Sequence, residues 1–180
     1  MAARKKIILG ATGSIAAFKA ADIVSSLVQK GAEVHVIMTR EAENFITPLT
    51  LAMLSCNKVY SRMFDMPDAW DVEHISLADS ADLVLIAPAT ANVIGKLAGG
   101  ICDDLLTCVV TATRAPVLIA PAMNDGMYTH KIVEANIARL KEIGYHFIGP
   151  VKGRLVCGRN AMGRMSGIDE IAANALKLAR

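Results

Sequence analysis

The chain has 180 residues, a length typical of one compact domain. Apolar residues make up 53% of it and charged residues 20%, a balance that excludes a disordered protein. The 19 basic and 17 acidic residues leave a net charge of +2 and form no long run of one sign, so nothing points to nucleic acid or an anionic lipid surface as a partner. We expect a small neutral or anionic ligand.

Hydropathy gives no sign of a membrane partner. The longest apolar block, residues 83–89, is far shorter than the roughly 18–20 residues that cross a bilayer. The basic start followed by residues 7–9 imitates a signal peptide, but polar residues 12–14 interrupt the apolar stretch, and Lys19 and Asp22 follow at once. We therefore expect a cytoplasmic protein.

The four cysteines have no metal-binding spacing. Cys56, Cys102, Cys108 and Cys157 form no C-x-x-C pair, so we expect neither a metal site nor a disulfide framework. The first three lie among apolar residues on expected helices, where cysteine behaves as a small core residue. Cys157 lies in a Gly- and Arg-rich stretch, 152–159, which we predict to be a mobile loop and whose arginines would lower the thiol pKa.

Strands and helices alternate along the chain. Residues 5–10 form a short aliphatic run, and apolar residues at helical spacing follow from Ser14 to Lys30. Gly31 suits the end of that helix because glycine tolerates left-handed geometry. In chain order we expect strands at residues 5–10, 34–38, 83–87, 117–120 and 146–148, and helices at 14–30, 132–143 and 169–179.

Strands that are apolar along their whole length are typical of a parallel sheet covered on both faces. The sequence therefore predicts an α/β fold, a single-domain, three-layer, doubly wound parallel sheet of the Rossmann-like or flavodoxin-like kind over residues 1–180. Ligands of such sheets bind beyond the carboxyl ends of the strands, here at segments 10–14, 39–45, 88–92 and 121–127. Ordinary surface loops have a similar composition, so this pattern alone leaves both interpretations open.

The first of these segments suits a phosphate group. Unpaired N–H groups at the start of a helix favour an anion, although Ser14 could equally cap the helix in an ordinary tight turn. The G-x-G-x-x-G fingerprint is absent, and no acid follows the second strand, which disfavours NAD. Arg40 leaves NADP as an alternative ligand, because its guanidinium could bind a 2′-phosphate. Thr39 lies closer to the strand end and favours a mononucleotide, so FMN is the economical ligand.

Several segments together resemble a known family. They are Gly10-Ala11-Thr12-Gly13-Ser14-Ile15-Ala16-Ala17, His74, Ala87-Pro88-Ala89-Thr90-Ala91-Asn92, Asp103-Asp104-Leu105-Leu106-Thr107, Pro121-Ala122-Met123-Asn124-Asp125-Gly126-Met127-Tyr128, and Cys157-Gly158 before Gly163-Arg164-Met165. In this order and spacing they resemble the homo-oligomeric flavin-containing cysteine decarboxylases, over about Lys5 to Met165. The resemblance is strongest to the members that act in coenzyme A biosynthesis.

The resemblance implies an FMN-dependent enzyme that decarboxylates 4′-phosphopantothenoylcysteine to 4′-phosphopantetheine. It also implies a homo-oligomer, either a trimer or a dodecamer, with FMN and substrate at a subunit boundary. Many bacterial relatives carry a downstream synthetase domain. Because this chain stops at Arg180, we expect a monofunctional decarboxylase.

The resemblance also assigns roles to residues. It implies that His74 is the catalytic base, although a lone histidine is more often a structural residue. It implies that Cys157 is a proton donor on a flap over the substrate. It implies that Asn124 and Met127 bind the substrate, its carboxylate in particular. Without the resemblance, Asn124 would equally be a turn residue that caps a helix. The expected FMN contacts are Gly13, Ser14 and Thr39 at the phosphate and Phe45, Ala89, Thr90, Ala91, Asn92 and Ala122 around the ring and ribityl chain.

Two departures from the family pattern concern substrate contacts and the flap. Tyr128 stands where a Trp is usual, and Ala161-Met162 stand where Gly-Pro is usual.

The chemistry explains why a flavin is needed. Direct loss of CO2 from a cysteine amide would leave a carbanion without an electron sink. Oxidation of the thiol to a thioaldehyde puts the carboxylate β to a C=S group, so the electron pair can delocalise as an enethiolate. The flavin takes and later returns the hydride, which leaves no net redox change.

Three alternatives remain at this stage. A peptidyl-cysteine decarboxylase of peptide-antibiotic maturation shares fold and flavin, but the Cys157 flap favours the small phosphorylated substrate. A non-catalytic flavin-binding regulatory subunit is disfavoured because relatives in that role carry a long acidic tail that this chain lacks. An NADP-dependent reductase is the most distant alternative.

Overall fold

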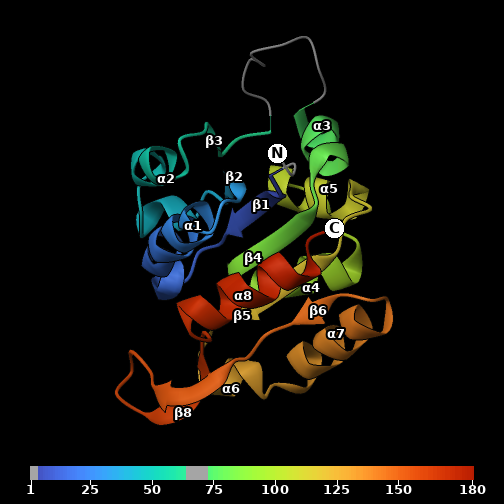
Figure 1. Ribbon diagram of the computed structural model, residues 1–180. Coiled ribbons are helices and arrows are strands. Elements are labelled where there is room, and N and C mark those ends of the chain that lie inside the picture. The colour runs from blue at the N-terminus through green and yellow to red at the C-terminus, as the bar shows by residue number, and fades with distance from the viewer. Residues whose placement is uncertain (1–3, 64–72) are drawn as a thin grey trace.

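The computed structural model describes residues 4–63 and 73–180, so part of the basic start lies outside the described residues. Six parallel strands form one sheet in the spatial order β3-β2-β1-β4-β5-β6, which is the Rossmann order (Figure 1). The predicted doubly wound parallel α/β fold is therefore confirmed. The strands are β1 (Lys6–Ala11), β2 (Glu33–Met38), β3 (Val59–Tyr60), β4 (Leu83–Ala89), β5 (Val117–Pro121) and β6 (His146–Phe147).

Helices cover both faces because the strands are apolar on both sides. Ile7 and Leu9 of β1 pack into one core cluster and Ile8 into the other, as the alternation of side chains along a strand requires. Helices α1 (Ala20–Gln29), α2 (Pro48–Ser55) and α8 (Ile168–Leu178) cover the first face, and α3 (Glu73–Ser80), α4 (Ala91–Gly99), α5 (Leu105–Ala112) and α7 (Lys131–Glu142) cover the second. The predicted three layers are thus confirmed.

The first helix starts with a short 3-10 turn. The structure has η1 (Ile15–Lys19) followed by α1, where the sequence predicts one helix from Ser14 to Lys30. The side chain of Ser14 caps this start by accepting the N–H of Ala16 at 3.3 Å. Gly31 follows the helix with φ +88, as predicted from its tolerance of left-handed geometry.

The stretch around Cys157 forms a β-hairpin, where the sequence predicts a loop without regular structure. Strands β7 (Val151–Arg154) and β8 (Asn160–Arg164) pair antiparallel, and Cys157 lies in the turn between them. The N–H of Leu155 donates to the carbonyl of Arg159 at 2.8 Å, which extends the pairing toward the turn. Short exposed strands have too few apolar residues for the alternation that reveals a strand in sequence.

The core placement of the cysteines is also wrong in two cases. Cys56 follows α2 in the left-handed region, with φ 55, and its side chain is exposed. Cys102 is exposed in the loop before α5, while Cys108 on α5 is half-buried. Apolar neighbours in sequence did not bury Cys56 and Cys102, because Cys56 caps the end of α2 and Cys102 lies in a loop. All four cysteines are free.

Within residues 4–63 and 73–180, no helix combines the length and apolarity that a membrane crossing needs.

We expect Gly10→Ala to destabilise the fold by about 1–3 kcal/mol, the usual cost of overpacking a core. A Cβ on Gly10 would lie 2.5 Å from Cδ1 of Leu106 on α5. Gly95→Ala on α4 is the matched control, because its Cβ would come no closer than 3.7 Å to Nδ2 of Asn136. Urea denaturation measures both free energies of unfolding. A Gly10→Ala variant as stable as the parent would contradict the close packing of α5 on β1.

Candidate functional site

Two adjoining cavities open at the carboxyl ends of the strands. The smaller cavity has a volume of about 310 Å³ and the larger one about 870 Å³, both within the range of small-molecule sites. Ser14, Ala122 and Met123 line both of them. Ligands in the two cavities would therefore be neighbours.

The hydroxyl of Thr12 joins the loops that follow β1 and β4. It donates to the carbonyl oxygen of Pro88 at 2.7 Å and accepts the N–H of Thr90 at 3.1 Å. Thr90 in turn caps α4 by accepting the N–H of Val93 at 3.3 Å. As a result the N-terminus of α4, where the helix dipole favours an anion, lines the smaller cavity.

The hydroxyl of Thr39 is a polar group without a partner in the smaller cavity. It is buried and makes no hydrogen bond among the described residues. The backbone N–H of Thr39 donates to the carbonyl oxygen of Ala11 at 3.0 Å, which fixes the residue beyond the end of β2. Because an unsatisfied buried hydroxyl is costly, a polar ligand group in this cavity would be stabilised by it.

Ser14 caps a helix, which is one of the two roles that the sequence leaves open for it. Besides capping η1, its hydroxyl donates to the carbonyl oxygen of Ala122 at 3.3 Å. That bond links the loops after β1 and β5 at the boundary of the two cavities.

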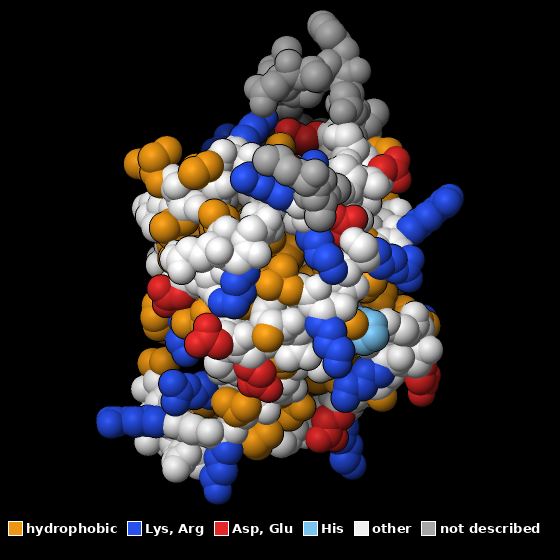
Figure 2. Space-filling view, in the orientation of Figure 1, with side chains coloured by type: hydrophobic (Ala, Val, Ile, Leu, Met, Phe, Trp, Pro, Cys, Tyr) orange, Lys and Arg blue, Asp and Glu red, His pale blue; other side chains and the backbone are white. Residues whose placement is uncertain are grey.

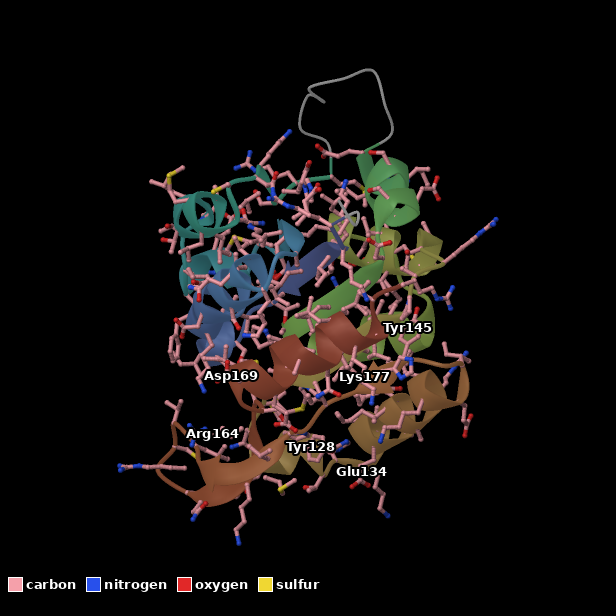
Figure 3. The ribbon with its side chains drawn as sticks, viewed as in Figure 1. Tyr128, Glu134, Tyr145, Arg164, Asp169 and Lys177 are labelled. Atoms are coloured by element: carbon pink, nitrogen blue, oxygen red, sulfur yellow. The ribbon has the colours of Figure 1, made fainter. Side chains whose placement is uncertain are left out.

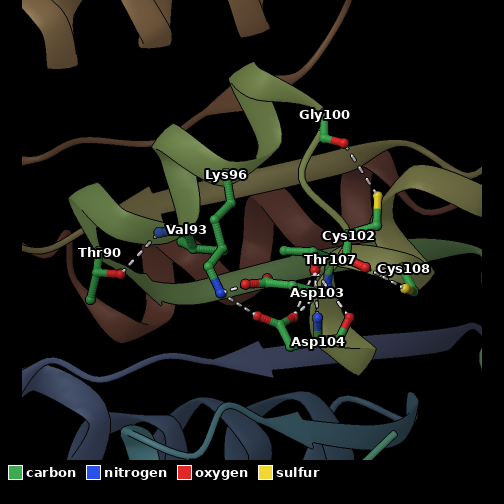
Figure 4. Close-up of polar contacts among 9 residues, drawn as sticks. All are labelled: Thr90, Val93, Lys96, Gly100, Cys102, Asp103, Asp104, Thr107 and Cys108. Carbon is green, nitrogen blue, oxygen red and sulfur yellow. Dashed lines mark hydrogen bonds and ion pairs between the residues drawn. The ribbon is translucent and has the colours of Figure 1, made fainter.

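A charged cluster forms another part of the smaller cavity's wall (Figure 4). Nζ of Lys96 lies 2.7 Å from Oδ1 of Asp103 and 2.9 Å from Oδ2 of Asp104. Asp104 also caps α5 by accepting the N–H of Thr107 at 2.8 Å. Burial alone would raise the pKa of the Asp104 carboxyl, but the bonds from Thr107 and Lys96 outweigh it and hold that pKa below its usual value.

The larger cavity lies between η1 and the hairpin β7–β8. Asn124 and Cys157 both line it. Oδ1 of Asn124 accepts the N–H of Gly126 at 2.9 Å and caps the short helix α6 (Asp125–Tyr128). Asn124 therefore has the helix-capping role that the sequence leaves open. The amide NH2 of Asn124 can still donate to a ligand.

Arg159 controls the thiol of Cys157 and fastens the hairpin. Its backbone N–H and guanidinium hydrogen-bond the sulfur and lower the pKa of Cys157, as predicted for a thiol near arginines. Nη2 of Arg159 also lies 2.8 Å from Oδ1 of Asp125, which ties the turn of the hairpin to α6. The N–H of Met123 donates to the carbonyl of Gly163 at 3.0 Å and ties the base of the hairpin to the end of β5.

The structure brings most of the predicted site residues to these cavities. Gly13, Ser14, Thr39, Thr90, Ala91, Asn92, Ala122 and Met127 line the smaller cavity, and Asn124 and Cys157 line the larger one. Three predicted residues line neither cavity: Ala89 is buried in β4, Phe45 is exposed, and His74 is half-buried on α3. In the part of the chain that the structure describes, no three His, Cys, Asp or Glu side chains are grouped to hold a metal ion.

Sequence reasoning did not assign Thr12 or Lys96 a role in the site, and it did not foresee the ion pair of Arg159 with Asp125. Thr12 belongs to the first loop, so its position alone could have indicated it. Lys96 lies four residues after Asn92 on α4, and helical spacing puts both on one face. The ion pair of Arg159 with Asp125 could be found only once the hairpin pairing was known, because that pairing sets the distance between them.

The model of the Flavoprotein family matches residues 1–179. The chain belongs to the Flavoprotein family. This flavoprotein chain is 49% identical over 175 residues to the coenzyme A biosynthesis bifunctional protein CoaBC of Bacillus subtilis, covering 97% of the chain and 42% of that protein. It therefore spans less than half the length of such bifunctional relatives. It is 46% identical over 169 residues to the probable phosphopantothenoylcysteine decarboxylase of Streptococcus mutans, covering 93% of the chain and 94% of that protein.

Solved structures have the same fold as this flavoprotein chain. A mutant PPC decarboxylase complexed with pantothenoylaminoethenethiol superposes with a TM-score of 0.86 at 32% identity, covering 97% of this chain and 98% of that one. The FMN-dependent cysteine decarboxylase SpaF superposes with a TM-score of 0.84 at 28% identity, covering 97% of both chains. The chain thus shares its fold with both a PPC decarboxylase and an FMN-dependent cysteine decarboxylase.

We expect Arg159→Gln to raise the pKa of Cys157, because the guanidinium contributes to its lowering while the backbone N–H remains. The pH dependence of iodoacetamide modification, followed peptide by peptide by mass spectrometry, measures this. The midpoint for Cys157 should move to higher pH, and that of exposed Cys56 should stay. An unchanged midpoint for Cys157 would contradict the role of Arg159.

The low pKa of Asp104 makes stability depend on pH. Because the folded-state pKa lies below the unfolded value of about 3.9, the stabilisation is present above that pH and is lost as pH falls through the folded pKa. Asp104→Asn keeps a capping side chain but removes the charge, so it should lower the free energy of unfolding by about 1–3 kcal/mol near neutral pH.

Urea denaturation from about pH 7 to about pH 3 follows the difference between parent and variant, which should shrink toward the acid end. Asp103→Asn is the control, since its side chain is 57% exposed, against 29% for Asp104. A difference between parent and Asp104→Asn that stays constant down to the acid end would refute the charge effect.

Proposed function

We propose that this flavoprotein chain binds FMN and decarboxylates 4′-phosphopantothenoylcysteine to 4′-phosphopantetheine, a step of coenzyme A biosynthesis. The observation that carries the proposal is the shared wall of the two cavities. A smaller cavity with an unsatisfied hydroxyl adjoins a larger one that is lined by Cys157. The Streptococcus mutans relative with the matching name, covered over 94% of its length, supports the same substrate.

The described residues fit the phosphate ester of FMN. The buried hydroxyl of Thr39, the loop of Gly13 and Ser14, and the N-terminus of α4 all line the smaller cavity. Hydroxyls, backbone N–H groups and a helix dipole together suit an anionic phosphate. Thr90, Asn92 and Ala122 would contact the rest of the cofactor. When bound, FMN would supply a two-electron acceptor that takes a hydride from the thiol-bearing carbon and later returns it.

The chain's own groups orient the substrate and move protons. The amide NH2 of Asn124 donates to the substrate carboxylate, and Met127 contacts the substrate beside it. Cys157 gives its proton to the carbon that has lost CO2. Its lowered pKa makes the thiol a stronger acid, which suits a proton donor. His74 assists removal of a proton from the substrate at the oxidation step.

We also propose that the active form is a homo-oligomer, a trimer or a dodecamer. His74 and Phe45 line neither cavity of one chain. Large apolar side chains are exposed on η1 and α2, with Phe18 54% exposed and Leu49 and Met53 each 68% exposed. A second copy would cover such side chains and could complete the site. A fully active monomer in analytical ultracentrifugation would contradict this.

The substrate and the roles of two residues are tested together by mass spectrometry. The chain reconstituted with FMN should remove one CO2 from 4′-phosphopantothenoylcysteine and none from a peptide that ends in cysteine. His74→Asn should block the first oxidation, and Cys157→Ser should stop after decarboxylation with an oxidised enethiol accumulating. Decarboxylation of the peptide alone would contradict the proposed substrate. Activity without flavin would refute the role of FMN. Full turnover by either variant would refute the role of the substituted residue.

A further inference from the structure

Two of the four free cysteines lie next to each other at the start of α5 (Figure 4). The thiol of Cys108 on α5 donates to the carbonyl oxygen of Cys102, with the sulfur 3.4 Å from that oxygen. The thiol of Cys102 donates to Oγ1 of Thr111 at 3.2 Å. Thr111 lies three residues after Cys108, so helical spacing puts both side chains on one face of α5. Both the carbonyl and the sulfur of Cys102 therefore lie over the face that carries the thiol of Cys108.

This arrangement is close to the geometry that a disulfide needs. Standard bond lengths put Sγ of Cys108 within about 6 Å of Cα of Cys102. A disulfide joins Cα atoms that are about 4.4–6.8 Å apart. Cys102 lies in the loop 100–104 between α4 and α5, where no helix or strand holds its backbone. A turn of its side chain from Thr111 toward Cys108 would bring the two sulfurs together.

The two thiols differ in how an oxidant reaches them. Cys102 is exposed, whereas Cys108 is half-buried. Burial raises the pKa of Cys108 most, and negative charge on Cys102 raises it further. Burial also raises the pKa of Tyr145, and the charge on Cys102 adds to this, so Cys102 lies near Tyr145, which is labelled in Figure 3. Because a buried, protonated thiol reacts slowly with an external oxidant, Cys102 is the thiol that reacts first.

The loop that carries Cys102 is also part of the wall of the smaller cavity. Asp103 follows Cys102 directly, and its Oδ1 lies 2.7 Å from Nζ of Lys96 on α4. Lys96 also pairs with Asp104, and both of these residues line the smaller cavity. In the dithiol state the loop is thus held to α4 through Asp103. A disulfide to Cys108 would hold the same loop to α5 instead and draw Asp103 away from Lys96.

We propose that Cys102 and Cys108 form a reversible disulfide with a peroxide or disulfide oxidant, and that this bond loosens the wall of the smaller cavity. The disulfide does not depend on the proposed function. Its effect on the cavity rests on the proposed binding of FMN there.

The reaction with hydrogen peroxide takes two steps. The sulfur of Cys102 attacks one peroxide oxygen, the O–O bond breaks, and one water molecule leaves a sulfenic acid on Cys102. The sulfur of Cys108 then attacks the sulfur of Cys102, the S–O bond breaks, and a second water molecule leaves. The two thiols together lose two electrons and two protons, and the peroxide is reduced to two water molecules. A thiol reductant reverses the bond by exchange.

One tryptic peptide, residues 97–114, contains both cysteines, because Lys96 and Arg114 are the basic residues that flank it. The chain is treated with hydrogen peroxide, blocked with iodoacetamide in urea, digested and weighed by mass spectrometry. The peptide should be lighter by two hydrogen atoms and carry no blocking group, and dithiothreitol before blocking should restore two blocked thiols. Cys102→Ser and Cys108→Ser should each abolish the bond. A parent peptide with both thiols blocked after peroxide treatment would overturn the proposal.

Cys56 supplies the matched control. It follows α2, whose apolar side chains are exposed in Figure 2 and which covers the opposite face of the sheet from α5. Cys56→Ser should leave the disulfide of peptide 97–114 unchanged. In glutathione buffers, the folded chain should form the bond with an equilibrium constant at least about 10-fold higher than the chain unfolded in urea. Equal constants would mean that spacing in the sequence is sufficient, and would overturn the role of the fold.

Flavin fluorescence titration measures the effect on the cavity. The disulfide form should bind FMN about 2- to 5-fold more weakly than the dithiol form, the range of one exposed ion pair. Asp103→Asn should weaken binding by a similar factor in the dithiol form, with no further loss on oxidation, because both changes act on the bond to Lys96. In Cys108→Ser, which keeps Cys157 but cannot form the bond, the oxidant should leave the affinity unchanged.

The outcomes separate the disulfide from the proposed function. Equal FMN affinity of the two forms of the parent would overturn the effect on the cavity and leave the disulfide standing. No FMN binding by either form would defeat the proposed function, and the peptide masses would still decide whether the disulfide forms.

Discussion

One buried hydroxyl connects the parts of the site. Thr12 bonds to Pro88 and Thr90, and so fixes the loop after β1 against the loop after β4. Both strands lie in the middle of the sheet and are buried over nearly their whole length, where there is no water to satisfy backbone groups. The position of α4, and with it the anion-favouring end of that helix, depends on this contact. Thr12 thus holds the loops after β1 and β4 together at one side of the smaller cavity.

The two cavities differ in how they attract a ligand. The smaller one offers an unsatisfied hydroxyl and a helix N-terminus, and the cation among its described lining residues, Lys96, is already paired with Asp103 and Asp104. The larger one is lined by Lys19, Arg154 and Arg164, and no Asp or Glu is among its described lining residues. Between them, Asp125 and Arg159 hold the turn of the hairpin, so that the same guanidinium positions the turn and tunes the thiol of Cys157. Cofactor and substrate would thus be recognised by separate sets of residues on either side of one wall.

The sequence predicts the sheet well because burial on both faces leaves a simple signal. Runs such as Leu83–Ala89 are apolar at every position, and their order along the chain is enough for the doubly wound fold. It predicts poorly where structure depends on pairing between segments. The hairpin that carries Cys157 has exposed strands, and β3 has two residues, so neither shows a period.

The site divides in the same way. Loops that follow strands could be found in advance, and Thr39, Thr90 and Ala122 lie where expected. Lys19 and Arg164 meet only because the hairpin folds back over η1, although they are far apart in sequence. His74 lines neither cavity of one chain. Under the proposed homo-oligomer it would reach the site of a neighbouring copy, a proximity that no single sequence pattern records.

The central claim is that FMN binds at the tips of the parallel strands, and a crystal structure of the chain grown with FMN tests it most directly. The account predicts electron density for FMN in the smaller cavity, with a phosphate oxygen within hydrogen-bond distance of Oγ1 of Thr39. Density for FMN elsewhere, or a smaller cavity that stays closed to the cofactor while the hydroxyl of Thr39 remains without a partner, would contradict it.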